Sequence, residues 1–282
     1  MGDLHALRAT LRQFDRIVVA FSGGADSSFL AWVATDTLGA DRVTCVTALS
    51  PSLASFEHEE CARIATEWAL NWLEVETAEM QNAAYRRNDA DRCFWCKDAL
   101  MDALEPIARE HDAVVVLGVN VDDLGDHRPG QRAAAARGAR FPLVDAGFTK
   151  SELRTASQVL GLSTWDKPAA ACLASRLPYG TPVEIGVLAS VEAAESGLRA
   201  LGFRDVRVRH YRDLARVEVP VADLAALLCV RDQVVEAIKA AGYRYVTVDL
   251  EGLRSGNLNA ALELPTLEGR PGPALSPPHD RR

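Results

Sequence analysis

The stretch "DRIVVAFSGGADSSFLAWVA", residues 15–34, decides the fold of the N-terminal half. Its apolar run, residues 17–21, is typical of a buried strand and breaks into a turn of small residues, 22–28. A helix-like apolar segment follows at once. In a strand-turn-helix unit, the unpaired N–H groups of the turn and of the first helical turn point in one direction. The pattern therefore predicts an anion site suited to phosphate.

The residue types of this turn support the prediction. Gly23 and Gly24 let an anion approach the backbone, and Ser22, Ser27 and Ser28 add hydroxyl donors. No lysine follows the glycines, so the turn is not a G-x-x-x-x-G-K-[ST] loop, and G-x-G-x-x-G is also absent. The alternative is a turn that merely caps a helix. We expect phosphate to be bound by a different glycine-rich pattern.

Composition narrows the class of protein. The 282 residues, 48% hydrophobic and 25% charged, are enough for one large or two modest domains. A net charge of −8 argues against nucleic-acid binding by bulk electrostatics. There is no membrane-length apolar run and no apolar core of a secretion signal near the N-terminus, so we expect a cytoplasmic protein. Six cysteines are too few for a disulfide scaffold.

The first half of the chain alternates strand-like and helix-like segments, which is typical of a doubly wound α/β domain. Right-handed crossovers would make its sheet mostly parallel. We place this domain at residues 1–177. The expected strands are 17–21, 43–49, 72–76 and 113–119, and the expected helices are 27–38, 55–70, 97–110 and 150–160.

The second half has a different order of elements. Thr181 and Glu184 suggest a capping box that begins a helix, followed by two strands, "DVRVRHY" and "ARVEVP". A helix over 222–241 and a strand over 243–250 complete an α+β pattern. We predict a smaller C-terminal domain at residues 178–264 that binds substrate or mediates oligomerisation. The tail, residues 265–282, is rich in proline and glycine, and we expect it to be disordered.

Two cysteines stand at C-x-x-C spacing in "RCFWCK". Cys93 and Cys96 are expected just before a helix, where the helix N-terminus and the neighbours Arg92 and Lys97 lower thiol pKa values. Such thiols suit metal binding or sulfur chemistry. One pair cannot complete a four-ligand zinc site, and two half-buried structural cysteines are the alternative.

A third cysteine stands apart from these two. Cys172 lies in a short loop bounded by prolines and is followed by Arg176, which makes it a candidate nucleophile. Cys45 and Cys229 occupy core-like positions, and Cys61 lies in a helix pattern without a clear assignment. Cys93, Cys96 and Cys172 are therefore the candidates for chemistry, and Cys61 stays undecided.

Two further groups of polar residues, and one lysine, occur in patterns typical of ligand binding. In "RVRH", Arg207 and Arg209 alternate along a strand and share a face that suits phosphate, although pairing with Glu218 is the alternative. Lys150 opens a helix with its own capping box and is within reach of a nucleotide phosphate. Polar residues also follow the fourth strand, where α/β sheets place ligands, and they suit nucleotide or Mg²⁺ contact, with an ordinary acidic loop as the alternative: Asn120, Asp122, Asp123, Asp126 and Arg128.

Two levels of resemblance follow from these motifs. The turn S-G-G-x-D-S resembles the pyrophosphate loop (PP-loop) of the ATP pyrophosphatases, which have the adenine nucleotide alpha hydrolase-like fold. The whole chain, from about residue 4 to 262, resembles the LarE family of ATP-dependent sulfur transferases. The ordered motifs that carry this resemblance are "SGGADSS", "RCFWCK", "GVNVDDLGDHRPG", "DAGFTKSELR", "ACLASRLPYG", "RVRHYRDLARVE" and "DLEGLRSGNLN".

The resemblance implies an enzyme of nickel-pincer cofactor synthesis, which serves lactate racemase and related enzymes. Its substrate is a pyridinium mononucleotide with two carboxyl groups, and ATP activates one of them as an acyl-adenylate, with release of pyrophosphate and later AMP. Activation is needed because a carboxylate accepts a thiolate only when its oxygen becomes a good leaving group. The family cysteine matches Cys172. It forms a thioester, and cleavage of its own C–S bond then leaves a thiocarboxylate and dehydroalanine.

The resemblance also implies roles for individual residues and partners. Asp26 and Cys172 are the catalytic residues, and Asp26 also helps to hold Mg²⁺. Arg176, Arg207, Arg209 and Arg216 contact the substrate. We expect a homo-oligomer, a hexamer by resemblance, with no nucleic-acid or membrane partner. ATP is bound by Ser22, Gly23, Gly24, Asp26, Ser27, Ser28, Asn120, Asp126 and Lys150.

The cysteines leave two routes of sulfur delivery open. Related sulfur transferases use three cysteines to hold a [4Fe–4S] cluster, and Cys93, Cys96 and Cys172 form such a set here. We favour delivery from a cluster over sacrifice of Cys172. The alternatives to the whole interpretation are a tRNA thiolase or an amide-forming ligase of the same superfamily, and a nucleotide-binding protein without turnover.

Overall fold

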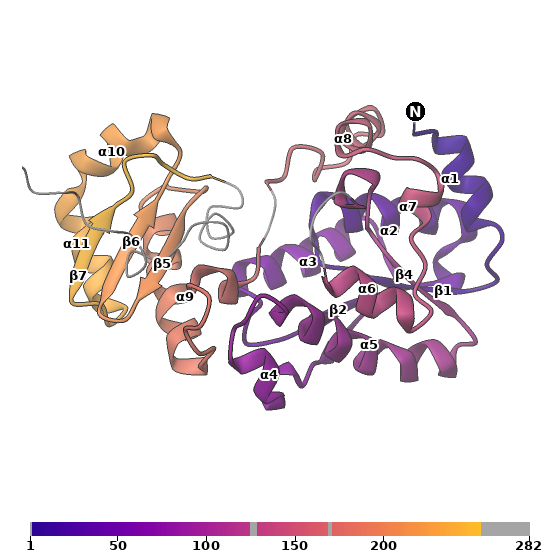
Figure 1. The fold of residues 1–282 in the computed structure, drawn as a ribbon. Helices are drawn as coiled ribbons and strands as arrows, with labels where there is room; N and C mark the ends of the chain where they lie inside the picture. Colours follow the sequence, from indigo (N-terminus) through magenta and orange to yellow (C-terminus); the bar gives the residue numbers. More distant parts are fainter. Residues whose placement is uncertain (1, 125–128, 169–170, 255–282) are drawn as a thin grey trace, which may run out of the picture.

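The computed structural model describes residues 2–124, 129–168 and 171–254. Figure 1 shows a large lobe and a small lobe, each built on its own sheet. Asp126, Arg128 and the predicted tail at 265–282 lie outside the described residues. Within the described parts, no helix has the length and apolar character that crossing a membrane requires.

The sheet of the large lobe has four parallel strands in the order β3-β2-β1-β4. The predicted α/β fold with a parallel sheet is confirmed. Because β1 lies between β2 and β4, the turn that follows it opens at the carboxyl edge between two neighbouring strands. The strands are β1 (Ile17–Ala20), β2 (Val43–Leu49), β3 (Trp72–Glu76) and β4 (Val114–Leu117).

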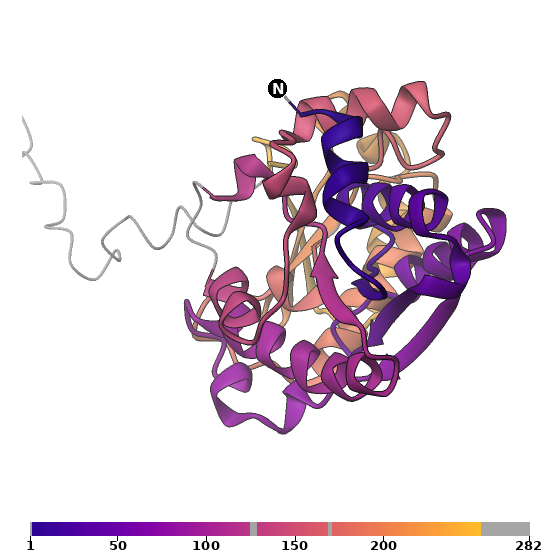
Figure 2. The same ribbon diagram turned by 90° about the vertical axis from the view of Figure 1, so that its right-hand side faces the viewer.

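Helices cover both faces of this sheet, as Figure 2 shows around β4. One face packs against α1, α2, α3 and α8, and the other against α5 and α6. Alternation along β1 explains the two layers, because Ile17 and Val19 enter the first core and Val18 enters the second. The helices are α1 (Leu4–Leu11), α2 (Ala25–Leu38), α3 (Ser55–Glu67), α5 (Arg92–Glu110), α6 (Pro129–Ala136) and α8 (Lys150–Val159).

Short helical turns fill the connections at the sheet edges. Those that follow β3 and β4 lie after the carboxyl ends of these strands, where a ligand of an α/β sheet binds. These turns are η1 (Ala40–Arg42), η2 (Glu79–Gln81), α4 (Ala83–Arg86), η3 (Val121–Leu124), α7 (Pro142–Asp145) and η4 (Leu173–Arg176).

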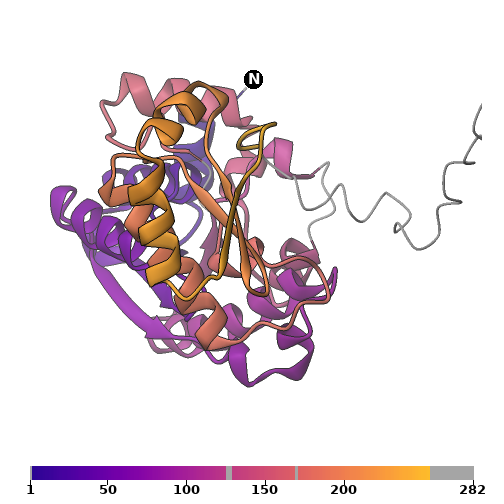
Figure 3. The same ribbon diagram turned by 90° about the vertical axis from the view of Figure 1, so that its left-hand side faces the viewer.

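The small lobe has a three-stranded sheet in the order β5-β6-β7. Strands β5 and β6 are antiparallel, whereas β6 and β7 are parallel. Figure 3 looks toward this lobe and shows helix α11 beside the strands; buried residues of α9, α10 and α11 form one core with the sheet. The elements are α9 (Ile185–Ala200), β5 (Arg207–Tyr211), β6 (Leu214–Glu218), η5 (Val221–Asp223), α10 (Leu224–Cys229), α11 (Arg231–Ala240) and β7 (Tyr245–Val248).

Three predictions for the small lobe were wrong. The capping box at Thr181 is not formed: helix α9 begins at Ile185, and its N-cap, Glu184, makes no side-chain cap. Another contact holds the residues before the helix: the N–H of buried Val183 donates to the carbonyl of Arg86. The helix expected over 222–241 is interrupted at Val230, and Cys229 is exposed and does not lie in the core.

Candidate active site

The phosphate loop joins β1 to α2 with the geometry that an anion site needs. Gly23 has a φ of +66°, and a Cβ atom there would lie 2.8 Å from Cys61 Sγ, so only glycine fits. Helix α2 begins at Ala25 after Gly24, and no side chain caps it. The first N–H groups of a helix have no partner within the helix. They therefore remain available to an anion at the carboxyl edge of the sheet.

The serines of the loop have different roles. Ser27 Oγ accepts the N–H of Ser22, lies 3.1 Å from Ser22 Oγ, and donates to the carbonyl of Gly24. It fixes the shape of the turn. Ser28 is fully buried, and its Oγ has no hydrogen-bond partner in the described parts of the chain. Such an unpartnered hydroxyl is costly, and a bound ligand or water would satisfy it.

Asp26, one position inside helix α2, is oriented by residues from two other elements. Its Oδ1 accepts a hydrogen bond from Asn120 Nδ2 at 3.4 Å, and its Oδ2 lies 3.8 Å from Lys150 Nζ. Burial raises the pKa of Asp26, Lys150 opposes the rise, Asp123 adds to it, and the net shift is upward. The predicted ATP-binding residues Asn120 and Lys150 therefore lie together with Asp26.

This arrangement fits a magnesium ion that binds together with a phosphate. Mg²⁺ is usually held by one or two carboxylates plus phosphate oxygens and water, so a complete protein cage is not needed. Asp26 and Asp123 are the carboxylates that interact here, and a divalent cation would relieve their repulsion. Asp122 is engaged elsewhere, since its Oδ2 accepts the N–H of Lys150 at the start of α8.

The second centre is a group of thiols around Arg92. Arg92 is buried, and its Nη1 donates to Asn88 Oδ1 and to the carbonyl of Ala174. Burial lowers the pKa of Arg92, but attraction by the thiols of Cys172 and Cys93 outweighs it. No carboxylate pairs with Arg92 among residues that the structure describes. Its guanidinium group therefore supplies positive charge directly to the thiol centre.

Cys96 differs from its prediction. It lies in the first turns of α5, and burial raises its pKa to about 12. Lys97 lowers the pKa to a smaller extent, whereas Cys172 and Cys93 raise it further. The expected lowering of the pKa by the helix N-terminus is wrong for this thiol, because desolvation is the larger effect. The same interactions place Cys93, Cys96 and Cys172 at one centre.

The three thiols have the right chemistry for an iron–sulfur cluster, since such clusters take thiolate ligands. The positive charge of Arg92 also suits an anionic group there. Their spacing is wider than that of a metal site: over residues 2–124, 129–168 and 171–254, no three His, Cys, Asp or Glu side chains are grouped closely enough to hold a metal ion.

Arg176 holds the loop that carries Cys172. Its Nε and Nη2 donate to the two carboxylate oxygens of Glu195 at 2.8 and 3.0 Å, and both side chains are buried. Its Nη1 donates to the carbonyl of Cys172 at 3.1 Å. The bidentate pair anchors η4 to helix α9 of the small lobe. In this form of the protein, Arg176 positions Cys172 and is not exposed to a substrate.

The arginines of the small sheet are of two kinds, those paired with a carboxylate and one that is not. Arg209 is buried and paired with Glu218, and Arg216 also contacts Glu218. Pairing with Glu218, the alternative for this strand face, is therefore observed. Arg207 has no hydrogen bond or ion pair to any residue in the described ranges. Burial lowers its pKa, and repulsion by Arg176 and Arg209 lowers it further. An anion beside Arg207 would relieve both effects.

Comparison with known proteins shows which family the chain belongs to. Residues 6–103 match the family model described as NAD synthase. An uncharacterised protein of Synechocystis is 43% identical over 93% of this chain and 98% of its own length. The pyridinium-3,5-bisthiocarboxylic acid mononucleotide synthase of Lactiplantibacillus plantarum is 38% identical over 91% of this chain and 93% of its own length.

This chain belongs to the LarE family. The alignment with the synthase spans nearly the whole chain and so covers both lobes. An uncharacterised protein of Methanocaldococcus jannaschii is more distant, at 27% identity over 85% of this chain and 91% of its own length.

Two site residues of this LarE-family chain were missed in the sequence. Lys167 Nζ donates to the carbonyl of Gly23 in the phosphate loop, and Arg154 of α8 lowers the pKa of Asp26. Arg154 follows Lys150 by one helical turn, so the i, i+4 spacing was the available signal. Lys167 had no such signal, because it approaches the loop only through the fold.

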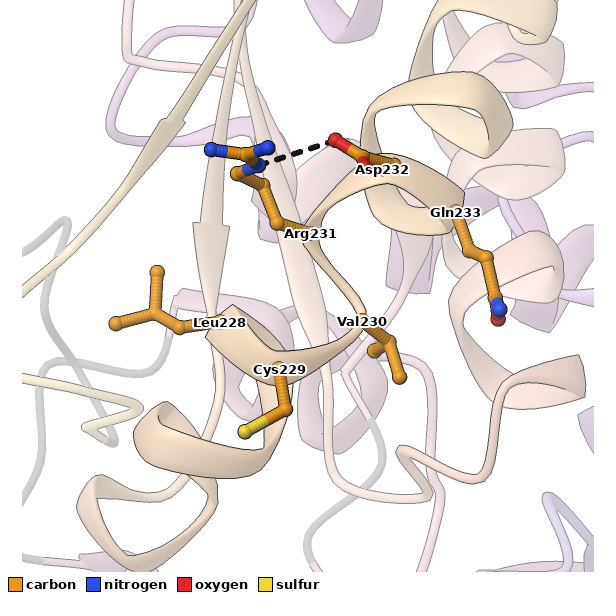
Figure 4. Close-up of a pocket in the computed structure, with 6 residues that line it drawn as sticks. All are labelled: Leu228, Cys229, Val230, Arg231, Asp232 and Gln233. Carbon is orange, nitrogen blue, oxygen red and sulfur yellow. Dashed lines mark hydrogen bonds and ion pairs between the residues drawn. The ribbon is translucent and has the colours of Figure 1, made fainter.

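The hollow in Figure 4 is not part of this site. It lies where α10 meets α11 and is lined by residues 228–233, with Arg231 and Asp232 paired at its rim. None of the predicted catalytic, ATP-binding or substrate-binding residues of the LarE-family chain lines it. Cys229 is exposed there, far along the chain from the three thiols of the site.

Proposed function

We propose that the protein is an ATP-dependent sulfur transferase that acts on a pyridinium dicarboxylate mononucleotide. One carboxylate is adenylated and then converted to a thiocarboxylate, as a step of nickel-pincer cofactor synthesis. The proposal is supported by family membership and by the similarity to the pyridinium-3,5-bisthiocarboxylic acid mononucleotide synthase of L. plantarum. The observation that carries it is the thiol centre around Arg92, in the same chain as an uncapped phosphate loop.

Adenylation is assigned to the phosphate loop. A carboxylate oxygen of the substrate bonds to the α-phosphorus of ATP, the bond from that phosphorus to the bridging oxygen breaks, and pyrophosphate leaves with the electron pair. The N–H groups at the start of α2 bind phosphate oxygens, and Asp26 helps to hold Mg²⁺ against them. Asn120 and Lys150 fix the Asp26 carboxylate.

Sulfur transfer is assigned to the thiol centre. The Cys172 thiolate attacks the acyl-adenylate, a C–S bond forms, and AMP leaves with the electron pair of the broken C–O bond. In the sacrificial route, a base would then remove the Cα proton of Cys172, the C–H electron pair would form the Cα=Cβ double bond, and the Cβ–S bond would break with its electron pair on sulfur. This releases the thiocarboxylate and leaves dehydroalanine. A cluster held by Cys93, Cys96 and Cys172 would instead supply an exchangeable sulfide that attacks the acyl-adenylate and displaces AMP.

The substrate phosphate is assigned to the small lobe. Arg207 is the arginine that supports this most directly, since it is partly buried, lies near two other arginines, and has no partner in the described parts of the chain. Arg209 and Arg216 would contact the phosphate only by exchanging contacts with Glu218. Hexamer formation and a role in lactate racemase maturation stay predictions from the family resemblance, and a cytoplasmic location stays a prediction from the sequence pattern.

The proposed function is tested by separating its two steps. With ATP, Mg²⁺ and the mononucleotide, the protein should release pyrophosphate and form a thiocarboxylate, which mass spectrometry detects as exchange of oxygen for sulfur. Asp26→Asn should abolish pyrophosphate release. Cys172→Ala should keep pyrophosphate release and abolish the thiocarboxylate. Thiocarboxylate formation by the Cys172 variant would remove this residue from the mechanism.

A further inference from the structure

Lys167 makes an unusual pair of contacts beside the phosphate loop. Its Nζ donates to the carbonyl oxygen of Gly23 at 3.1 Å and to Glu57 Oε2 at 2.8 Å. The side chains of Lys167 and Glu57 are only 15% and 12% exposed. Glu57 lies in the first turn of α3, so the ammonium group joins the loop to a neighbouring helix.

The backbone of Lys167 is also held in place. Its N–H donates to the carbonyl of Thr164, and its own carbonyl accepts Arg154 Nη2 at 2.8 Å. Arg154 belongs to α8, the helix whose first residue is Lys150. One helix thus places Lys150 beside Asp26 and fixes the backbone from which Lys167 reaches Gly23. The position of the lysine is set by the fold and not by a flexible surface contact.

The charge balance at the loop points to an anion. A lysine ammonium group has three N–H donors, of which two are used here. It lies against the turn that precedes the uncapped start of α2. The helix N-terminus and the ammonium group both attract negative charge. Glu57 is the carboxylate in direct contact with the lysine, and Glu60 interacts with it at longer range. A polyphosphate would add negative charge on the side of the loop.

We propose that Lys167 binds the β- and γ-phosphates of ATP, the part that leaves as pyrophosphate, and that Glu57 holds its ammonium group in position. This inference rests on the proposed function, in which the loop binds ATP. When the bond between the α-phosphorus and the bridging oxygen breaks, the electron pair moves to pyrophosphate, and the ammonium group stabilises the charge that develops there.

A purely structural ion pair is the competing explanation, and ligand choice separates the two. We would titrate the full-length protein with inorganic pyrophosphate, ATP and AMP, each with Mg²⁺, by calorimetry. Lys167→Met should weaken pyrophosphate and ATP on the order of 10- to 100-fold, the range for a hydrogen bond to a charged group. AMP affinity should change less than about twofold, because AMP lacks the phosphates concerned.

Two further variants make the test specific. Glu57→Gln keeps an oxygen that can accept the hydrogen bond of the ammonium group and removes the negative charge that competes with phosphate. It should therefore bind pyrophosphate at least as tightly as the unmodified protein, whereas a structural pair would make it behave like Lys167→Met. Lys239→Met, an exposed lysine in α11, is the matched control and should change nothing.

The outcomes also separate this inference from the proposed function. Unchanged pyrophosphate binding in Lys167→Met, or an equal loss for AMP, would overturn the role of Lys167 alone. Failure of the unmodified protein to bind ATP and pyrophosphate would overturn the proposed function, and the role of Lys167 with it.

Discussion

Arg209 and Glu218 form an ion pair inside the small lobe, with Nη2 and Oε2 2.9 Å apart and the side chains only 3% and 0% exposed. Arg209 Nη1 also donates to the carbonyl of Ser175, three residues after Cys172. The pair therefore joins β5 and β6 to η4, the helical turn that directly follows Cys172. Removing one partner of such a buried pair strongly lowers the free energy of unfolding, because the other charge is left buried without compensation.

Arg209 and Arg207 should therefore respond differently to substitution. Arg209→Met leaves Glu218 without its shortest ion pair and should lower the free energy of unfolding by about 3–5 kcal/mol. Arg207→Met should leave stability unchanged or raise it, since Arg176 and Arg209 repel this cation. Urea unfolding measures both. The Arg207 variant should instead raise the KM for the mononucleotide. Equal destabilisation by the two variants would contradict this division of roles.

Gly23 should tolerate no side chain. Alanine at a φ of +66° costs about 1–2 kcal/mol, and its Cβ would also overlap Cys61 Sγ at 2.8 Å. Gly23→Ala should therefore lower the free energy of unfolding and weaken ATP binding. In the double variant with Cys61→Ala the overlap disappears while the backbone strain remains. A double-mutant cycle should show partial rescue; strict additivity would mean that the Cys61 contact is irrelevant.

The sequence predicted those features that depend on local chemistry. The alternation of residues 17–119 was enough for the parallel sheet, because strand and helix periodicities differ. The phosphate loop followed from residue type at the junction of β1 and α2. Element ends were less reliable: Cys93 and Cys96 were placed before a helix that in fact begins at Arg92.

Features that depend on long-range packing were not predictable. The pairing of Arg176 with Glu195 and the contact of Lys167 with Gly23 join segments far apart in the chain. No periodicity or spacing connects such residues. The pKa of Cys96 shows the same limit, since a nearby helix N-terminus was readable from the sequence but the burial that dominates the shift was not.

His210 should make stability depend on pH. Burial lowers its pKa below the ordinary value of 6.5, against a smaller opposite effect of Glu184. Between the lowered pKa and 6.5, the unfolded chain binds more protons than the folded chain. The free energy of unfolding should therefore fall as pH decreases below about 6.5, until the folded pKa is passed. His210→Gln should flatten this part of the profile, measured by urea unfolding. An unchanged slope would assign the dependence to other groups.

Iron content should decide how sulfur is delivered. Cys93, Cys96 and Cys172 interact around the buried guanidinium of Arg92, whose positive charge favours an anionic group. If they hold a cluster, protein purified without oxygen should contain iron and acid-labile sulfide in equal amounts. Cys93→Ala should lose both, whereas Cys229→Ala, which changes an exposed cysteine outside the centre, should keep them.

The opposite result is equally specific. Protein that takes up no iron after anaerobic reconstitution would give its own sulfur, so one thiocarboxylate at most would form per Cys172. Mass spectrometry of the spent protein should then find dehydroalanine at this position. Repeated turnover with an intact Cys172 would contradict that route. If such turnover also stops in Cys93→Ala, the C-x-x-C pair is required to carry the sulfur, because neither thiol of that pair is consumed in the sacrificial reaction.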